Sequence, residues 1–182
     1  MPDMSWKFLR GFSQRSIAKK ADLTVLGLEQ VPTRGPVILA VRHVHHQIDG
    51  EALLATIPRP IHPMVATDWA AGGVAKRLLT FACRQARWPT VIRGNSPFST
   101  DQGERGRLNI RAFRDALQLL REDRIVAIFP EGFPNIDKNP TPKQGDDDML
   151  PFEPGFARLA HMAARQGVHA PIIPVGFHYE RG

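Results

Sequence analysis

Short apolar runs alternate along the chain with segments whose apolar residues recur at helical spacing. Residues 37–41 and 125–129 are the clearest runs, because each is apolar throughout and rich in β-branched residues, and this pattern predicts two buried strands. Weaker strand signals lie at 23–26, 65–66, 90–92 and 170–175. Helical signals lie at 4–20, 51–54, 75–87, 108–121 and 156–166.

This alternation predicts the α/β fold class, as a single domain with a largely parallel central sheet flanked by helices. No repeat or linker divides the 182 residues, so residues 23–182 are expected to form one domain after a basic N-terminal segment, residues 1–22. Residues 134–151 contain four prolines and predict an exposed loop. The chain ends at Gly182, a few residues past its last strand signal, so we expect that the domain lacks a C-terminal element.

The N-terminal segment mixes large apolar side chains with Lys and Arg. Trp6, Phe8, Leu9 and Phe12 stand among five basic residues between positions 7 and 20, which is typical of a basic amphipathic helix on an anionic lipid surface. A terminal helix packed on its own domain would show a similar pattern. Both interpretations remain open at this point.

The composition narrows the class of partner. Twenty-four Lys and Arg against 18 Asp and Glu give a net charge of +6, which favours anionic partners. These cations are spread along the chain rather than gathered in a recognisable motif, so no nucleic acid partner is expected. No apolar run approaches the roughly 20 residues that a membrane span needs. The single cysteine, Cys83, permits neither a disulfide nor a cysteine-based zinc cluster, and together with the lack of a signal-peptide pattern it favours a cytoplasmic location.

A histidine cluster follows the first clear strand. His43, His45 and His46 come directly after residues 37–41, and Asp49 follows at the start of a helical signal. Strand ends are where α/β folds place their sites, and a histidine oriented by a carboxylate is the usual general base for a hydroxyl group. The alternatives are a surface cluster and a metal site formed by His43, His45 and Asp49. Gln47 stands two residues after His45, so the metallohydrolase spacing His-x-His-x-Asp-His is not met.

Further along the chain, three more blocks give the cluster a context. The four blocks in order are Arg42-His43 to Asp49, Val91-Ile92-Arg93-Gly94, Phe129-Pro130-Glu131-Gly132 and Ile172-Ile173-Pro174-Val175. From about Thr24 to Tyr179, the chain resembles the glycerolipid acyltransferases, the lysophosphatidic acid acyltransferase family. Four blocks in the right order are far more specific than any one of them.

The resemblance implies transfer of a fatty acyl group from acyl-CoA or acyl carrier protein to the hydroxyl of a lysophospholipid, as in phospholipid biosynthesis, without a covalent acyl-enzyme. It implies that a His/Asp pair activates the acceptor, and that Arg93, Glu131 and Gly132 bind its glycerol-phosphate end. No cofactor and no metal are expected, because the thioester supplies the driving force. The expected location is peripheral on the membrane surface, where such an acceptor lies.

The chain departs from the family pattern at two places. The family block is Asn-His-x4-Asp, and counting back from Asp49 puts Val44 where the histidine should be. Aligning from the preceding strand instead ranks His43 first as the base, with His45 and His46 as competitors. After Gly132 the family usually has Thr or Ser and then Arg, whereas this chain has Phe133-Pro134, so an arginine expected to bind phosphate is missing.

Two other classes of protein remain as alternatives to an acyltransferase. A metal-dependent hydrolase would use His43, His45, His46 and Asp49 as its cluster. A noncatalytic lipid-binding domain would need the basic surface but none of this chemistry.

Overall fold

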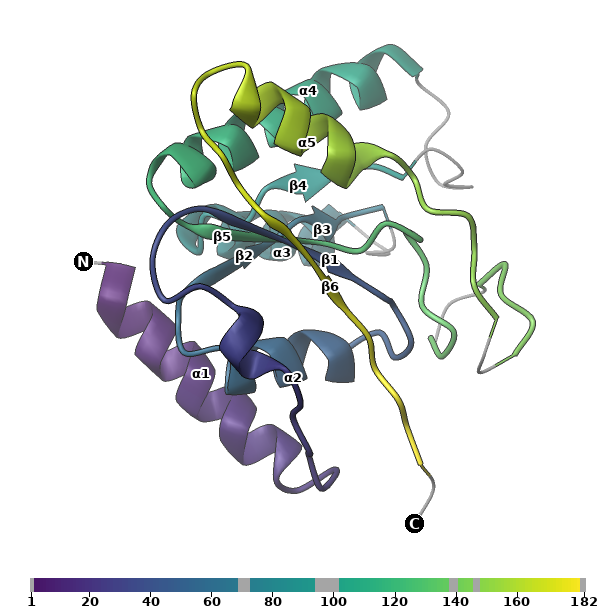
Figure 1. The fold of residues 1–182 in the computed structure, drawn as a ribbon. Helices are drawn as coiled ribbons and strands as arrows, with labels where there is room; N and C mark the ends of the chain where they lie inside the picture. Colours follow the sequence, from purple (N-terminus) through teal and green to yellow (C-terminus); the bar gives the residue numbers. More distant parts are fainter. Residues whose placement is uncertain (1, 69–72, 94–101, 138–140, 146–147, 181–182) are drawn as a thin grey trace.

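A parallel four-stranded sheet forms the centre of the computed structural model (Figure 1). The structure describes all residues except 1, 69–72, 94–101, 138–140, 146–147 and 181–182. The strands lie in the order β2-β5-β1-β6. Their bounds are β1 Val37–Val41, β2 Ile61–Pro63, β5 Ile125–Ile128 and β6 Ile172–Val175. The expected α/β fold with a mostly parallel sheet is confirmed.

Helices cover both faces of this sheet. Figure 1 shows α1 and α2 on one side and α4 and α5 on the other. A second, two-stranded parallel sheet pairs β3 with β4, and α3 connects them. The bounds of these elements are α1 Pro2–Ile17, α2 Ile48–Thr56, β3 Val65–Ala66, α3 Gly73–Gln85, β4 Thr90–Val91, α4 Gln102–Arg121 and α5 Gly155–Ala164, with a short 3-10 turn at Leu28–Gln30.

The two central strands are apolar at every position because both of their faces are buried. Along β1, Ile38 packs into the cluster that includes α4 and α5, whereas Val37 and Leu39 pack into the cluster that includes α1 and α2. Successive side chains of a strand point to opposite faces, so a sheet covered twice needs apolar residues throughout. Full burial of one such side chain contributes about 1.5–3 kcal/mol.

The first helix is part of this core. Trp6 is only 7% exposed and packs with the strand residues, and Ile17 packs on α2. Phe8 and Phe12 on the same helix point outward and are 74% and 58% exposed. The segment therefore packs on the domain through one face, and Trp6 is not available at the surface. Among the residues described, no helix is both long and apolar enough to cross a bilayer.

Several element predictions were wrong. Residues 23–26 form no strand, and Leu23, Val25 and Leu26 are exposed; the segment pairs with no strand of either sheet. Strand β2 was missed. The last strand, β6, is half-exposed rather than buried, since it lies at the edge of the sheet and pairs with β1 on one side. The loop 134–151 is not wholly exposed, because Pro134 and Lys143 are buried.

We predict that acid destabilises the protein through His62 on β2. Its side chain is buried, and burial lowers its pKa, so the folded state binds the proton less readily than the unfolded chain, whose histidines titrate near 6.5. The free energy of unfolding should therefore fall as the pH drops below about 6.5. Denaturant titrations from neutral to mildly acidic pH should show a shallower decline for His62→Gln. Replacing the exposed His169 in the same way should leave the decline unchanged.

Candidate active site

The side chains with chemical potential gather at the carboxyl edge of the sheet. Ala40 of β1 pairs with Ile128 of β5 in parallel register, so His43 and Glu131, each three residues further on, leave their strands side by side. The main-chain N–H of His43 donates a hydrogen bond to Oε1 of Glu131 at 3.0 Å. Two of the sequence blocks, 88 residues apart, are joined by this bond.

His43 is the histidine that contacts Asp49. Its Nδ1 lies 2.8 Å from Oδ2 of Asp49, whose side chain is fully buried. A carboxylate accepts hydrogen bonds, so Nδ1 carries the proton and Nε2 is left as the acceptor. The ring of His43 rests against Phe129, with 4.3 Å between ring centroids. The arrangement can therefore take a proton from a hydroxyl group placed at Nε2.

Main-chain N–H groups and a tyrosine hydroxyl also hold the carboxylate of Asp49. Its Oδ2 also accepts the N–H groups of Val44 at 2.8 Å and His45 at 3.0 Å. Its Oδ1 accepts the hydroxyl of Tyr179 at 2.5 Å. Partial burial and this bond raise the pKa of Tyr179 above its usual range, so the phenol stays protonated and donates. Every partner of Asp49 thus favours one orientation of its carboxylate.

The extra residue between His43 and Asp49 is accommodated by a local bend. The main chain of Val44 accepts from the N–H of Ile136 at 2.8 Å, and the N–H of His46 donates back to Ile136 at 3.1 Å. This pairing with the loop that follows β5 turns the segment so that two N–H groups face Asp49. The histidine two residues after His43 is thereby directed elsewhere.

The two competing histidines do not contact Asp49 with their rings in the part of the chain that is described. Nδ1 of His45 is buried without a hydrogen-bond partner there. The ring of His46 lies 6.4 Å from that of His43. Burial lowers the pKa of His46, Asp137 opposes this effect, and the positive Arg93 adds to it. His46 therefore lies in the site as a neutral neighbour of the His43–Asp49 pair.

A buried lysine that the sequence did not indicate lies beneath His43. Nζ of Lys143 is 2.6 Å from Oε2 of Glu131, and it donates to the carbonyl oxygen of His43 at 2.8 Å and to Oδ1 of Asn135 at 2.9 Å. Oε2 of Glu131 also accepts the N–H of Leu150 at 3.1 Å. Both Glu131 oxygens and all three lysine donors are thus engaged within the protein.

This geometry changes the interpretation of Glu131. Its carboxylate is fully buried and faces Lys143 and main-chain N–H groups, so its expected contact with an acceptor finds no support in the geometry. Instead, Glu131 accepts from the main-chain N–H of His43, and Lys143 donates to its carbonyl oxygen. They fix the main chain of His43 rather than line an open surface.

Arg93 is positioned by the smaller sheet. Ala66 of β3 pairs with Val91 of β4, so Asp68 and Arg93, each two residues further on, lie together, with 2.9 Å between Nε and the carboxylate. A guanidinium N–H of Arg93 donates to the carbonyl oxygen of Gly132 at 3.2 Å. The structure therefore brings Arg93 and Gly132 together and adds Asp68.

Two residues shape the turn that Arg93 contacts. Gly132 has φ of +73°, a left-handed conformation that glycine adopts without strain. The guanidinium of Arg93 lies 4.2 Å from the centroid of the Phe133 ring, a cation–π contact. The phenylalanine that replaces a family hydroxyl residue thus packs against the arginine. Gly94 lies outside the described residues.

Sequence reasoning missed three of the contributing residues: Asp68, Lys143 and Tyr179. Asp68 follows a two-residue strand, Lys143 lies in a proline-rich loop, and Tyr179 lies beyond the last strand. A buried carboxylate at position 131 requires a cation or several donors, and this was the one physical signal that pointed toward a lysine. It did not say which one.

The metal alternative gains nothing from the geometry. Within the described ranges, no group of three or more His, Cys, Asp or Glu side chains is placed to hold a metal ion. Nδ1 of His43 is hydrogen-bonded to Asp49, so this nitrogen is already engaged and does not point to a metal site.

An α/β domain that holds a histidine–carboxylate pair at the carboxyl edge of a parallel sheet carries the groups that can activate a hydroxyl group. The family model described as Acyltransferase matches residues 22–178, and the chain belongs to that family. This confirms the resemblance inferred from the four blocks and implies an acyl donor and a lipid acceptor as substrates. No curated protein and no solved structure gives a significant match.

Proposed function

We propose that the protein transfers a fatty acyl group from acyl-CoA or acyl carrier protein to the hydroxyl of a lysophospholipid, with lysophosphatidate as the reference acceptor. The observation that carries this proposal is the 2.8 Å contact between His43 and the buried Asp49, which leaves Nε2 as an acceptor at the sheet edge. Membership of the acyltransferase family supports the reaction class.

In the proposed reaction, Nε2 of His43 accepts the proton of the acceptor hydroxyl while its oxygen attacks the thioester carbonyl. The new C–O ester bond forms and the C–S bond breaks. The proton held by His43 then passes to the departing thiolate, so no covalent acyl-enzyme and no cofactor is needed. Asp49 stabilises the positive imidazolium that exists between the two proton transfers.

Arg93 is the proposed contact for a phosphate on the acceptor. Its planar guanidinium suits phosphate oxygens, and Asp68 and Gly132 already fix its direction. Asp68 also offsets part of its charge, and Pro134 stands where the family has its second arginine. We therefore expect a smaller dependence on the acceptor phosphate than two arginines would give.

The proposed location is the membrane surface on the cytoplasmic side, with peripheral attachment. Support comes from the net charge of +6 and from a lipid acceptor that lies in a bilayer. Phe8 and Phe12 remain at the surface of α1 for such a contact, but Trp6 does not.

We predict that release of free CoA from palmitoyl-CoA depends on an added lysophospholipid, and that the lipid product gains one acyl chain by mass spectrometry. A panel of lysophospholipids with different headgroups, and acyl carrier protein as a second donor, would define the substrates. Asp49→Asn is the matched control, because it keeps the shape of the side chain and misorients the base.

Three outcomes would contradict this proposal. CoA release without any acceptor would indicate a thioesterase. Lipid binding without CoA release would indicate a noncatalytic lipid-binding domain. Turnover lost on chelation and restored by zinc would support the metal-dependent hydrolase.

A further inference from the structure

Helix α3 carries a stripe of large apolar side chains on its outer face. Val74, Leu78 and Phe81 are 72%, 65% and 62% exposed. Positions three and four apart lie on one face of a helix, so these three form a continuous row. Cys83, on the opposite face, is only 1% exposed. The helix therefore packs through one face and turns a second apolar face outward.

Cations flank this row on one side. Arg77 and Arg84 lie about one residue's rotation from the row, at 100° per residue, and both are exposed. Neither forms an ion pair within the described part of the chain. Arg87, two residues past the end of α3, differs, because Glu122 binds it through two contacts of 2.7 and 2.9 Å. Arg77 and Arg84 thus place two uncompensated positive charges beside the apolar row.

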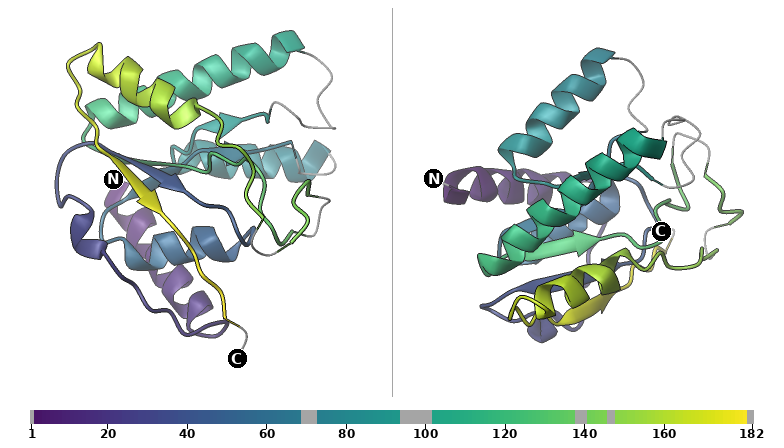
Figure 2. Two further views of the ribbon diagram at one scale, coloured as in Figure 1. Left: turned by 45° about the vertical axis from the view of Figure 1, so that its right-hand side comes forward. Right: turned by 90° about the horizontal axis from the view of Figure 1, so that it is seen from above.

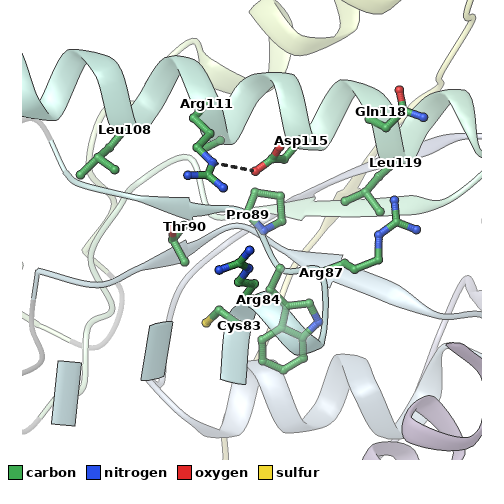
Figure 3. Close-up of a pocket in the computed structure, with 12 residues that line it drawn as sticks. Cys83, Arg84, Arg87, Pro89, Thr90, Leu108, Arg111, Asp115, Gln118 and Leu119 are labelled. Carbon is green, nitrogen blue, oxygen red and sulfur yellow. Dashed lines mark ion pairs between the residues drawn. The ribbon is translucent and has the colours of Figure 1, made fainter. Parts of the chain in front are cut away.

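A cleft of about 290 Å³ opens between α3 and α4, and Arg84 is one of the residues that line it. Figure 3 shows Arg84 on the α3 side and Arg111 on the α4 side, with Arg111 directed at Asp115. That pair is long, 3.9 Å, and both side chains are more than half exposed. An anionic group that enters the cleft would therefore meet Arg84 and little competing negative charge.

The first turn of α3 lies at the same edge of the molecule as the candidate active site. Asp68, which holds Arg93, precedes Gly73 at the start of α3 by five residues. In the right-hand view of Figure 2, α3 lies at the outside of the molecule, and in both views its first turn lies toward the side that carries the loops after β1 and β5. A surface in contact with α3 would border that edge.

We propose that α3 is the helix by which this protein docks on a bilayer containing anionic phospholipid. Val74, Leu78 and Phe81 enter the boundary between headgroups and acyl chains, and Arg77 and Arg84 contact the headgroup phosphates. An apolar face flanked by arginines fits an anionic bilayer better than an apolar protein surface, because burying unpaired guanidinium groups against protein is costly. Helix α3 would then provide the peripheral attachment proposed above. The presence of a lipid acceptor at this surface rests on the proposed acyl transfer.

The alternative docking helix is α1, which also leaves apolar side chains outside. Its Trp6 and Ile17 are buried in the core, so Phe8 and Phe12 remain. Helix α3 presents three such side chains in one row, and it begins five residues after Asp68. On these grounds α3 is assigned the main contact.

The test measures co-sedimentation of the full chain with phosphatidylcholine vesicles, with and without phosphatidylglycerol, at low and high salt. Binding should require phosphatidylglycerol and weaken as salt rises. Leu78→Glu and Phe81→Glu should each weaken binding at least about tenfold, because a large apolar side chain no longer enters the bilayer. Arg77→Gln should weaken it about fivefold.

Leu26→Glu is the matched control, because it makes the same change at a 90% exposed leucine far from α3 in sequence, and it should bind as the unchanged protein does. Equal losses for Leu26→Glu and Phe81→Glu would overturn the proposal, as would wild-type binding by both α3 variants. Loss with Phe8→Glu alone would assign docking to α1. A dimer in solution that Phe81→Glu dissociates, with vesicle binding unchanged, would mean that a second copy covers α3. Vesicle binding needs no turnover, so a failure of the proposed acyl transfer would not be mistaken for a failure of docking.

Discussion

Replacing His43 with alanine is expected to lower kcat by about 10² to 10⁴, the usual contribution of a positioned general base. The reason is local, because His43 is the described histidine whose ring contacts the buried Asp49. Folding should be little affected, since the lost ring is partly exposed and the main chain remains held by Glu131 and Lys143. Initial rates of CoA release, with a thermal unfolding curve for the same sample, measure both effects.

His45→Ala and His46→Ala distinguish this assignment from its competitors. Both side chains lie near His43 without contacting Asp49, so we expect changes of less than about tenfold. His169→Ala, at an exposed position, controls for the loss of a histidine as such. A larger loss with His46→Ala than with His43→Ala would show that the base is His46 and that the contact between His43 and Asp49 is only structural.

The second large effect is expected at Lys143. Replacing it with methionine leaves the Glu131 carboxylate buried without its cation, and breaking a buried pair in this way typically costs about 3–5 kcal/mol. The carbonyl oxygen of His43 loses its donor at the same time. Chemical denaturation should show a much lower unfolding midpoint. Lys20→Met is the matched control, because the pair between Lys20 and Glu51 is at the surface and contributes at most about 1 kcal/mol.

A double variant separates the structural role of Lys143 from its role in the site. Lys143→Met combined with Glu131→Gln removes both buried charges and should recover much of the lost stability. If the pair also positions His43, kcat of the folded double variant should stay low, while its KM for the acyl donor should change little. Recovery of kcat together with stability would show that the pair contributes to folding alone.

The central strands and the fold class could be predicted from the sequence because they follow from periodicity. Residues 37–41 and 125–129 are buried on both faces, so their apolar runs left little room for another element. Strand β2 was hidden by Pro60 and Pro63, which count against a strand. It forms because it lies at the edge of the sheet, where a missing N–H is tolerated.

Of the candidate site, only the residues that lie within the four sequence blocks could be predicted from the sequence. Ranking His43 first depended on counting from the strand, and the structure places it at Asp49, although its catalytic role stays a prediction. Lys143 could not be found, because a polar, proline-rich segment predicts an exposed loop, in which no buried lysine is expected. No spacing rule links position 143 to position 131. The contact between Arg93 and Asp68 depends on the register of two very short strands, which a sequence pattern does not fix.

The edge position of β6 also affects how the protein behaves at high concentration. The carbonyl oxygens of Pro171 and Val175 accept bonds from β1, so alternation along the strand turns the main-chain groups of Ile172 and Pro174 outward. A second chain could add to this edge as a further strand, which is a common route to aggregation. Proline at position 174 has no N–H to offer, so one of the outward donors is missing. Pro174 therefore makes this exposed edge a poorer template for self-association.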